Sequence, residues 1–375
     1  MNDRVMVSVI CLTYNHEKYI EQTIKSIVSQ ITDFKFELII HDDNSTDRTT
    51  NIVREYEKEY PDIINAIYEE ENMYSKGYDA LRNLCIPVAR GKYIAFCEGD
   101  DYWIDDKKIQ IQYEIMEKSA DVDMCSCSAI ELCSDGETHE IRPFDTDCIL
   151  PIEDVIVGGG GYLATNTLFF RKELLTSYMP FERILSMDYE FQIKGALRGG
   201  IYYIDKNMTV YRKFTENSWT RKICEDTEKR KSHIEKEISM LRQFDIDTEG
   251  RYHDCIERRI EAYTPFYDQL MNHREEFLNE LASCRDGIWI WGMGLRGDAA
   301  QKFCKNEKIV IDGVCDKQNT GLGEKTEHGQ VVDSTENCLK KSKAILASNN
   351  IIYNYLIDEG YPGVLINLQK YMPLS

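Results

Sequence analysis

Short apolar runs alternate with helix-periodic stretches along the first hundred residues. The run at 5–12 is rich in β-branched residues and predicts a buried strand. Three similar runs predict further strands, at 36–41, 63–68 and 93–97. Apolar positions at helical spacing predict helices between them, over 17–29, 47–60 and 80–89. Strands that alternate with helices indicate a mostly parallel sheet with flanking helices, so we expect an α/β fold.

The pattern continues beyond this first part with more strands and helices. We expect helices over 107–118 and 188–197, and strands at 124–130, 167–170 and 201–204. From 222 to 284 the chain is charged and helix-periodic with a break near 245–250, which predicts a pair of helices.

A new α/β pattern starts at Asp286. It predicts strands at 288–291, 308–314, 344–347 and 363–366, with a glycine-rich turn and a helix over 298–305 after the first of them. We therefore expect three parts: a catalytic domain over 1–220, a helical linker over 221–285, and a small Rossmann-like module over 286–375.

The net charge restricts the choice of partners. The 375 residues contain 65 acids and 45 bases, a formal charge of −20. Binding to nucleic acid needs a basic surface, so we expect no nucleic-acid partner. A phosphate-bearing substrate remains compatible with this charge, because a divalent cation can bridge acids to phosphate.

Several sequence features favour the cytoplasm. No run approaches the roughly 20 apolar residues that span a bilayer. The chain begins Met1-Asn2-Asp3-Arg4 and continues directly into a strand pattern, so we expect no signal peptide. The thirteen cysteines lack zinc-like spacing, and we expect them to be reduced thiols.

An acid cluster follows the strand at 93–97. Glu98, Asp100 and Asp101 surround Gly99 there. A strand cannot keep three unpaired carboxylates in the core, so the cluster must lie at the carboxyl end of the sheet, facing solvent, a metal or a ligand. Asp42 and Asp43 follow the second strand and should reach the same edge. Their alternative role is to form a turn before the next helix, for which Ser45 or Thr46 would suffice.

These pieces resemble family 2 glycosyltransferases of the GT-A fold over roughly residues 5–220. The resemblance rests on ordered segments at the ends of successive strands: Val7-Ser8-Val9-Ile10-Cys11-Leu12-Thr13-Tyr14-Asn15, Asp42-Asp43-Asn44-Ser45-Thr46-Asp47, Leu81-Arg82-Asn83, Glu98-Gly99-Asp100-Asp101-Tyr102-Trp103, Ser186-Met187-Asp188, Gly200-Ile201-Tyr202-Tyr203-Ile204-Asp205 and Tyr211-Arg212.

The resemblance implies a site for the donor nucleotide. Asp43 would accept a hydrogen bond from the base, while Tyr14, Asn15 and the backbone around Leu12 would flank base and ribose. Half-exposed packing at a strand end is the alternative for Tyr14. Arg82 resembles a family arginine that contacts the donor, although a solvated helix face would explain it equally well.

The resemblance also implies a metal site. Glu98, Asp100 and Asp101 stand where the family's DxD-type acid motif falls. Asp101 and Asp100 would hold the metal, and hard oxygen ligands suit Mn²⁺ or Mg²⁺. Asp100 or Glu98 would contact the ribose, with Glu98 standing where relatives often have aspartate. The alternative is an acidic loop that caps the helix at 107–118.

Asp188 is the candidate catalytic base. By resemblance it would take the proton from the acceptor hydroxyl in an inverting transfer. Its alternative role is that of a first-turn acid favoured by the helix dipole, and Glu190 is the weaker candidate for the base. Many relatives have a histidine two residues after the Tyr-Arg pair. Here Phe214 takes that place, and Arg212 or Lys213 would have to supply the positive charge.

The C-terminal turn has the spacing of a nucleotide-binding loop. Gly292, Gly294 and Gly297 follow a strand and open a helix, and Asp316 ends the next strand, where a ribose-binding acid would stand. NAD or another nucleotide is one expectation. A pure packing role is the other, because no residues for hydride transfer are evident.

Taken together, the sequence predicts a metal-dependent, inverting glycosyltransferase that uses a nucleotide-sugar donor, and the family resemblance implies UDP as the nucleotide. The acceptor would be a hydroxyl of a cell-surface glycan, free or lipid-linked. A lipid-linked acceptor would bring the protein to the inner face of the membrane. The alternatives are a non-catalytic scaffold that binds sugar nucleotides, and a bifunctional protein with an NAD-dependent C-terminal domain. The sequence does not indicate an oligomeric state.

Overall fold

The computed structural model describes residues 4–183, 188–216, 218–284, 286–316 and 321–372. The chain forms two compact units, Met1–Ile256 and Glu257–Ser375. Their boundary falls inside the stretch 221–285, which the sequence predicts as a linker, and the three-part division stays a prediction. Within the described ranges, no helix combines the length and the apolar character needed to cross a bilayer.

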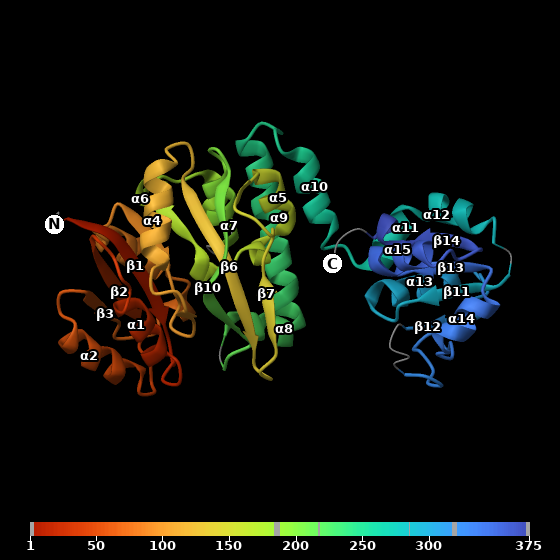
Figure 1. Ribbon diagram of the computed structural model, residues 1–375, viewed down its shortest axis with the longest axis horizontal. Coiled ribbons are helices and arrows are strands. Elements are labelled where there is room, and N and C mark those ends of the chain that lie inside the picture. The colour runs from red at the N-terminus through yellow and green to blue at the C-terminus, as the bar shows by residue number, and fades with distance from the viewer. Residues whose placement is uncertain (1–3, 184–187, 217, 285, 317–320, 373–375) are drawn as a thin grey trace. The chain divides into compact units, whose positions relative to one another are not determined.

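The first unit is built on a ten-stranded mixed sheet. The strands follow the order β3-β2-β1-β4-β9-β6-β10-β5, with β7 beside β6 and β8 beside β10. Figure 1 shows β1, β2 and β3 side by side in red, and β6 and β10 together in the yellow-green half. The strands are β1 (Val5–Thr13), β2 (Lys35–Asp42), β3 (Ile64–Tyr68), β4 (Tyr93–Phe96), β5 (Tyr102–Trp103), β6 (Met124–Cys133), β7 (Thr138–Ile141), β8 (Cys148–Leu150), β9 (Phe169–Arg171) and β10 (Ile201–Lys213).

The first four strands run parallel, as the sequence predicts. β9 then runs antiparallel to both β4 and β6, and β6 and β10 are parallel to each other. The α/β class is therefore confirmed, with a sheet that becomes mixed beyond β4.

Helices pack against both faces of this sheet. On one face, Ile24 and Ile27 of α1 and Ile109 of α4 share a core with Val9 and Leu38 of the strands. On the other face, the rings of Phe96, Phe170 and Phe191 contact one another with centroids 5.5–5.9 Å apart, which fixes α7 over β4 and β9. The α-helices are α1 (Ile20–Val28), α2 (Thr49–Glu59), α3 (Ile86–Val88), α4 (Lys108–Lys118), α5 (Ile152–Gly158), α6 (Lys172–Thr176), α7 (Asp188–Ala196), α8 (Trp219–Glu225), α9 (Thr227–Asp247) and α10 (His253–Glu261). Short turns are η1 (Tyr74–Lys76), the π-helical η2 (Leu81–Cys85), η3 (Gly160–Tyr162), η4 (Thr165–Thr167) and η5 (Pro180–Arg183).

Two predictions were too small: the length of one strand and the number of helices in one stretch. β10 extends to Lys213, well beyond the strand predicted at 201–204, because register shifts around Asn207 carry the strand past its polar stretch. The predicted helix pair at 222–284 is five helices. One break falls at Gly250, which has φ +74°, and another precedes the helix that Pro265 caps.

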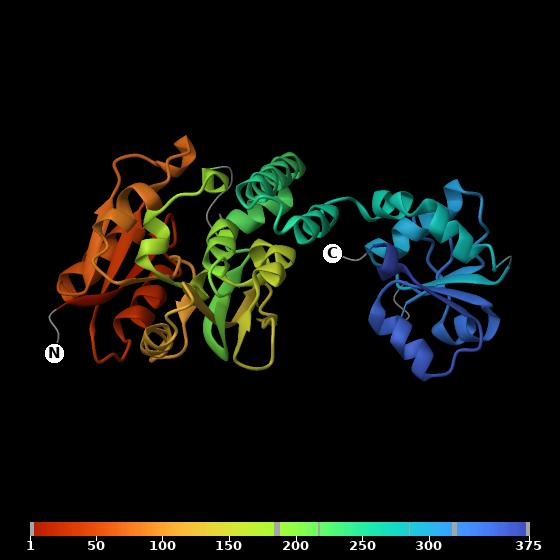
Figure 2. The same ribbon diagram turned by 90° about the horizontal axis from the view of Figure 1, so that it is seen from above.

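The second unit contains a four-stranded parallel sheet in the order β12-β11-β13-β14. Alternate residues of β11 enter two cores: Ile288 and Ile290 pack on the side of α13, and Trp289 and Trp291 on the side of α15. Figure 2 shows the helices on both sides of this sheet. The elements are β11 (Ile288–Trp291), β12 (Gly313–Cys315), β13 (Ala344–Ala347), β14 (Val364–Asn367), α11 (Phe266–Asn272), α12 (Arg274–Leu281), α13 (Leu295–Asn306), α14 (Thr335–Lys341), α15 (Asn350–Asp358) and α16 (Leu368–Tyr371).

The strand predicted at 308–314 is shorter in the structure. Only Gly313–Cys315 forms β12. Lys308 adopts a left-handed backbone with φ +60°, and the Asp312 carboxylate accepts hydrogen bonds from the amides of Gly287 and Ile288. These features keep the residues just before Gly313 from joining the strand that pairs with β11. The Rossmann-like assignment of this unit stays a prediction.

Candidate active site

Backbone hydrogen bonds join the loops that follow β1, β2 and β4. The amide of Gly99 donates to the carbonyl of Leu12 at 2.9 Å, and the amide of Asp43 donates to the carbonyl of Thr13 at 3.1 Å. β1 lies between β2 and β4 in the sheet. Asp43 and the acid cluster at 98–101 therefore lie at the same edge, on either side of the end of β1.

The loop of the acid cluster is held tightly. The Thr23 hydroxyl lies 2.6 Å from the carbonyl oxygen of Asp101 and 3.0 Å from that of Gly99. A Cβ at Gly99 would come within 2.5 Å of Thr13 Oγ1 and 2.7 Å of His16 Nδ1. Glycine is therefore required here, and the backbone fixes the directions of the flanking carboxylates.

Among the residues that the structure describes, one carboxylate oxygen of Asp101 has no hydrogen-bond partner. Oδ1 accepts a hydrogen bond from the amide of Arg212 at 2.8 Å, whereas Oδ2 is buried and unpaired, and the residue is 1% exposed. Burial raises the pKa of Asp101 well above its usual range, and the charges of Asp100 and Glu98 raise it further. An orphaned buried carboxylate oxygen is costly unless a cation or a donor completes it.

Two neighbouring acids add negative charge beside Asp101. Asp100 is also buried, and its Oδ2 accepts a hydrogen bond from the Thr215 hydroxyl at 2.7 Å. Burial raises the pKa of Glu98, and the charges of Asp188 and Asp100 raise it further. Hard oxygen ligands with excess negative charge and one unsatisfied atom fit a divalent cation such as Mn²⁺ or Mg²⁺.

Asp188 and Glu98 line one small cavity. Asp188 is the first residue of α7, and its Oδ2 accepts a hydrogen bond from the Thr165 hydroxyl at 2.8 Å. Burial raises the pKa of Asp188, while the bond from Thr165 opposes that rise. The cavity is lined by Ile10, Leu12, Leu81, Phe96, Glu98, Thr165, Asp188 and Phe191. A carboxylate held near a second acid in a partly apolar cavity has the environment of a general base. Ser186 and Met187 of the resembling segment lie outside the described residues.

Arg212 and Lys213 point to different sides of β10. The Arg212 guanidinium donates to the carbonyl of Asp100, lies 2.5 Å from Gln22 Oε1, and stacks over the ring of Tyr102. Lys213 instead pairs with Glu131 at 2.9 Å. Of the two predicted substitutes for the missing histidine, only Arg212 reaches the loop of the acid cluster.

The two acids after β2 have different roles. Asp42 accepts hydrogen bonds from the Ser45 amide and hydroxyl and from the Thr50 hydroxyl, which fits the turn-forming alternative. Asp43 is 5% exposed, and its carboxylate accepts hydrogen bonds from the amides of Met73 and Tyr74.

Asn15 joins the loop after β1 to the loop after β2, and Tyr14 precedes it in the chain. Asn15 Oδ1 accepts a hydrogen bond from the Thr46 amide at 2.7 Å, and the Asn15 amide donates to the Ser45 hydroxyl. Tyr14 is half-buried. The donor contacts of Asp43, Tyr14 and Asn15 stay predictions.

Arg82 is surrounded by carboxylates. Its guanidinium pairs with Glu190 at 3.0 Å and with Glu182 and Asp79 at 3.4 Å each, and its side chain is 9% exposed. The alternative of a solvated helix face is therefore wrong. The predicted donor contact remains a prediction, and in this structure the side chain joins η2 to α7.

Replacing Arg82 by methionine should lower the free energy of unfolding by about 3–5 kcal/mol, because the buried carboxylate of Glu190 would lose its ion pair with Arg82. Chemical denaturation measures this difference. The control is Arg198→Met, which removes the exposed pair with Asp123 and should cost at most about 1 kcal/mol. Equal losses in the two variants would contradict a structural role for Arg82.

The C-terminal glycines have identifiable positions. Gly292 has φ +107°, and a Cβ at Gly297 would lie 1.9 Å from the carbonyl oxygen of Gly292, so both are needed for the tight turn. Gly294 has open space around its Cβ position. Asp316 accepts a hydrogen bond from the Met293 amide at 3.1 Å, which ties it to the turn. The strand–turn–helix context is present, and nucleotide or NAD binding here stays a prediction.

The first unit has the fold of GT-A glycosyltransferases. TarS residues 1–349 of S. aureus, solved in complex with UDP, superpose with a TM-score of 0.52 at 19% identity, covering 73% of this chain and 78% of that one. The family model of glycosyl transferase family 2 matches residues 8–216, more than half of the chain. The protein therefore belongs to glycosyl transferase family 2.

Relatives from several organisms match parts of the chain. Rv1520 of Mycobacterium tuberculosis is 28% identical over 214 residues, which are 57% of this chain and 60% of that protein. TuaG of Bacillus subtilis, named for teichuronic acid biosynthesis, is 41% identical over 115 residues, 31% of this chain and 43% of TuaG. The Escherichia coli enzyme WfaP, named as a UDP-Glc:α-D-GlcNAc-diphosphoundecaprenol β-1,3-glucosyltransferase, is 39% identical over 117 residues, 30% of this chain and 41% of WfaP. The chain thus spans three fifths or less of the length of these relatives.

Sequence reasoning missed the hydroxyls that hold the acids. Thr23, Thr165 and Thr215 each contact the acid cluster or Asp188 from a distant part of the chain. A threonine carries no local signal of such a role, because only the tertiary fold brings it to its partner.

Proposed function

We propose that the protein transfers a sugar from a UDP-sugar to a hydroxyl of a cell-surface glycan acceptor. The transfer inverts the configuration at the anomeric carbon and depends on a divalent cation. The observation that carries this proposal is the unpaired buried Oδ2 of Asp101 beside Asp100 and Glu98. Asp188 lines the same cavity as Glu98 and so places a base next to this anionic site.

The choice of donor and acceptor draws on the relatives. WfaP is named for a UDP-glucose donor and an acceptor linked to diphosphoundecaprenol. TuaG is named as a putative glycosyltransferase of teichuronic acid biosynthesis. A UDP-sugar and a glycan acceptor, free or lipid-linked, are therefore the first to test. A lipid-linked acceptor would place the reaction at the inner face of the membrane.

Each acid has a proposed task. Asp101 and Asp100 would hold Mn²⁺ or Mg²⁺, which when bound supplies a Lewis acid for the charge of the diphosphate. Glu98 or Asp100 contacts the ribose. Asp188 accepts the proton of the attacking hydroxyl at its carboxylate, and the bond from Thr165 keeps that carboxylate oriented.

The test is a screen of sugar nucleotides for hydrolysis in the presence of Mn²⁺, read as release of the nucleotide. We expect release from a UDP-sugar and its loss when EDTA removes the cation. A screen in which no sugar nucleotide is hydrolysed, and none shifts the melting temperature, would contradict the proposal.

Thr165→Val should move the acid limb of the pH profile of kcat/KM to higher pH. The Thr165 hydroxyl stabilises the charged Asp188 and so lowers its pKa. Without that bond the pKa of Asp188 rises. The base works only when it is deprotonated, so the enzyme begins to lose activity at a higher pH than the wild type does. Thr165→Ser keeps a hydroxyl and should leave the limb near the wild-type position. An unmoved limb in the valine variant would mean that Asp188 is not the titrating base.

A further inference from the structure

Three side chains on the hairpin of β6 and β7 bring a carboxylate, a thiol and an imidazole together. Glu131 pairs with His139 across the antiparallel ladder, and Cys133 lies two residues beyond Glu131 on β6 (Figure 1). Directly paired residues, and residues two apart on one strand, share a face of the sheet. One ligand atom from each residue lies within 4.8 Å of the other two. We call these three residues the hairpin cluster.

The turn of the hairpin holds the backbone of this cluster in place. The Cys133 amide donates to the carbonyl of Glu137 at 2.8 Å, and the Gly136 amide donates to the carbonyl of Cys133 at 3.0 Å. Gly136 has φ +90°, which glycine adopts without strain. The Asp135 carboxylate accepts the Glu137 amide hydrogen at 3.0 Å. A backbone ordered in this way lowers the cost of gathering ligands around an ion.

The separations within the cluster suit a small tetrahedral site. The Cys133 sulfur lies 3.8 Å from Glu131 Oε1. Zinc binds sulfur at about 2.3 Å and nitrogen or oxygen at about 2.0–2.2 Å, so two ligands at the tetrahedral angle lie roughly 3.3–3.7 Å apart. The His139 side chain is 59% exposed and is free to turn toward the other two groups. Small side-chain rotations therefore bring all three groups to binding distance.

The ligand types favour zinc. A thiolate and an imidazole suit Zn²⁺, whereas Mg²⁺ and Mn²⁺ prefer sites built from oxygen alone. Three protein ligands leave a fourth position for water. Cys133 would bind as the thiolate and release its proton to the solvent. The spacing of the cysteines does not reveal such a site, because only one of the three ligands is a thiol.

Lys213 is a positive charge beside the cluster. Its Nζ lies 3.0 Å from Glu131 Oε1 and 2.9 Å from Oε2. An ion bound to Glu131 must therefore share the carboxylate with Lys213 or displace it, and sharing is compatible with a metal site, where ligating carboxylates also accept hydrogen bonds. Since Lys213 and Arg212 point to different sides of β10, the hairpin cluster is separate from the acid cluster that Arg212 reaches.

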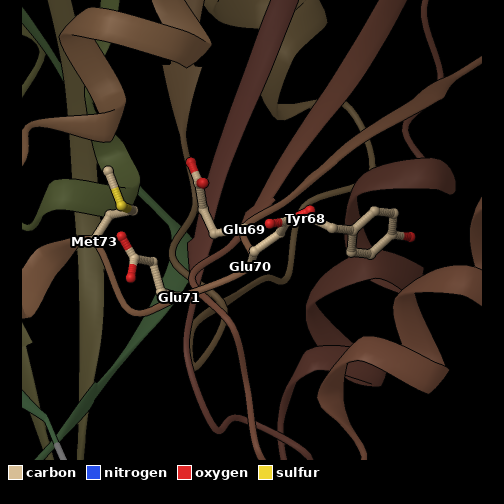
Figure 3. Close-up of a pocket in the computed structure, with 5 residues that line it drawn as sticks. All are labelled: Tyr68, Glu69, Glu70, Glu71 and Met73. Atoms are coloured by element: carbon tan, nitrogen blue, oxygen red, sulfur yellow. The ribbon is translucent and has the colours of Figure 1, made fainter.

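The acidic pocket after β3 has a different set of ligands. Two of its carboxylates already have partners: Glu69 lies 3.3 Å from His41 Nε2, and Glu71 pairs with Lys76. The pocket offers no thiol, and we assign no ion to it. Figure 3 shows the side chains around it, with the Tyr68 ring and the Met73 side chain pointing to opposite sides: Tyr68, Glu69, Glu70, Glu71 and Met73.

We propose that Glu131, Cys133 and His139 bind a Zn²⁺ ion that fastens β7 to β6. None of the four residues of β7 is fully buried, so apolar packing contributes little to the stability of this strand. An ion held from both strands would add a cross-link that the ladder hydrogen bonds alone do not provide. The ion is independent of the proposed transfer reaction.

The first experiment titrates the reduced protein with Co²⁺, which occupies zinc sites and absorbs in the near ultraviolet when a thiolate binds it. The wild type should develop this band and lose it when Zn²⁺ is added, because zinc binds such sites more tightly. Cys133→Ser should show no band. The matched control Cys148→Ser, which changes a partly buried cysteine of β8, should keep it. Asp101→Asn should also keep it, since the acid cluster is a separate site.

The second experiment measures Zn²⁺ affinity by calorimetry on the Asp101→Asn background, so that the acid cluster does not contribute. Losing a group that only hydrogen-bonds to a ligand costs about 10–100-fold in metal affinity, so His139→Ala and Glu131→Gln should each cost about 100-fold or more. Lys213→Met should bind Zn²⁺ more tightly, because it removes the competing cation. Glu70→Gln, which changes an exposed acid of the pocket in Figure 3, is the control and should bind like the parent.

The melting temperature without metal separates lost binding from lost folding. The three cluster side chains are exposed or half-buried, so their variants should melt close to the parent when no metal is present. A wild type without the thiolate band, or a band that survives in Cys133→Ser, would overturn the inference. An unchanged Zn²⁺ affinity in His139→Ala, or a weaker one in Lys213→Met, would contradict the proposed ligand set.

Discussion

Asp188→Asn is expected to lower kcat by about 10²–10⁴-fold, the usual contribution of a positioned general base. Asparagine has nearly the same shape and can still accept the hydrogen bond from Thr165, but it cannot take a proton at neutral pH. The affinity for UDP should stay within about twofold, because Asp188 acts on the acceptor hydroxyl. Initial rates of transfer and calorimetry with UDP measure the two quantities separately.

The stability of the same variant separates catalysis from a structural role. The charge of Asp188 raises the pKa of Glu98, so its removal relieves a repulsion between two acids in one cavity. The melting temperature should therefore stay the same or rise. If Asp188 were only a first-turn acid of α7, the variant would lose about 0.3–1 kcal/mol of stability and keep its kcat. Asp62→Asn, which alters an exposed acid outside the site, is the control for both measurements.

The position of the acid cluster could be predicted from the sequence because it depends only on strand direction. Parallel strands end at one edge of the sheet, so acids after the second and fourth strands had to approach each other. The structure adds that β1 lies between those two strands and supplies the carbonyls of Leu12 and Thr13 that join the loops.

The separation of Arg212 from Lys213 was predictable in principle. Successive residues of a strand point to opposite faces, so only one of the two can reach the acid cluster. The prediction ended the strand at residue 204, because the polar residues 205–207 interrupt the apolar pattern there. The register shifts that carry β10 to Lys213 depend on its pairing with β6, which local sequence does not reveal.

Other features depend on contacts between distant parts of the chain. Whether Asp101 keeps an unpaired oxygen depends on Arg212, whose amide satisfies only one of the two. Likewise, Asp43 looks like a ligand-binding acid in the sequence, and only the fold shows that Met73 and Tyr74 occupy its oxygens. Such pairings follow from tertiary packing, and no local propensity encodes them.

Asp101→Asn should abolish the rise in melting temperature that Mn²⁺ causes. In the wild type, a cation bound to the native state alone should raise the melting temperature, with a stabilisation of about 2.7 kcal/mol at a hundredfold excess over Kd. Asparagine keeps an oxygen for the Arg212 amide, so the fold should persist, but the charge that attracts the cation is lost. Without metal the variant should melt at the same temperature as the wild type or higher, because an unpaired buried carboxylate is removed.

The activity of Asp101→Asn should fall by about 10²-fold or more, since a cation at a departing diphosphate contributes several kcal/mol to the transition state. The matched control is Asp106→Asn, an exposed acid five residues further along the chain, which should keep both the Mn²⁺ response and the activity. A variant that retains the full Mn²⁺-induced rise in melting temperature would place the metal elsewhere. A wild type that shows no such rise would remove the cation from the mechanism, and the unpaired oxygen of Asp101 would then need a hydrogen-bond donor from the substrate.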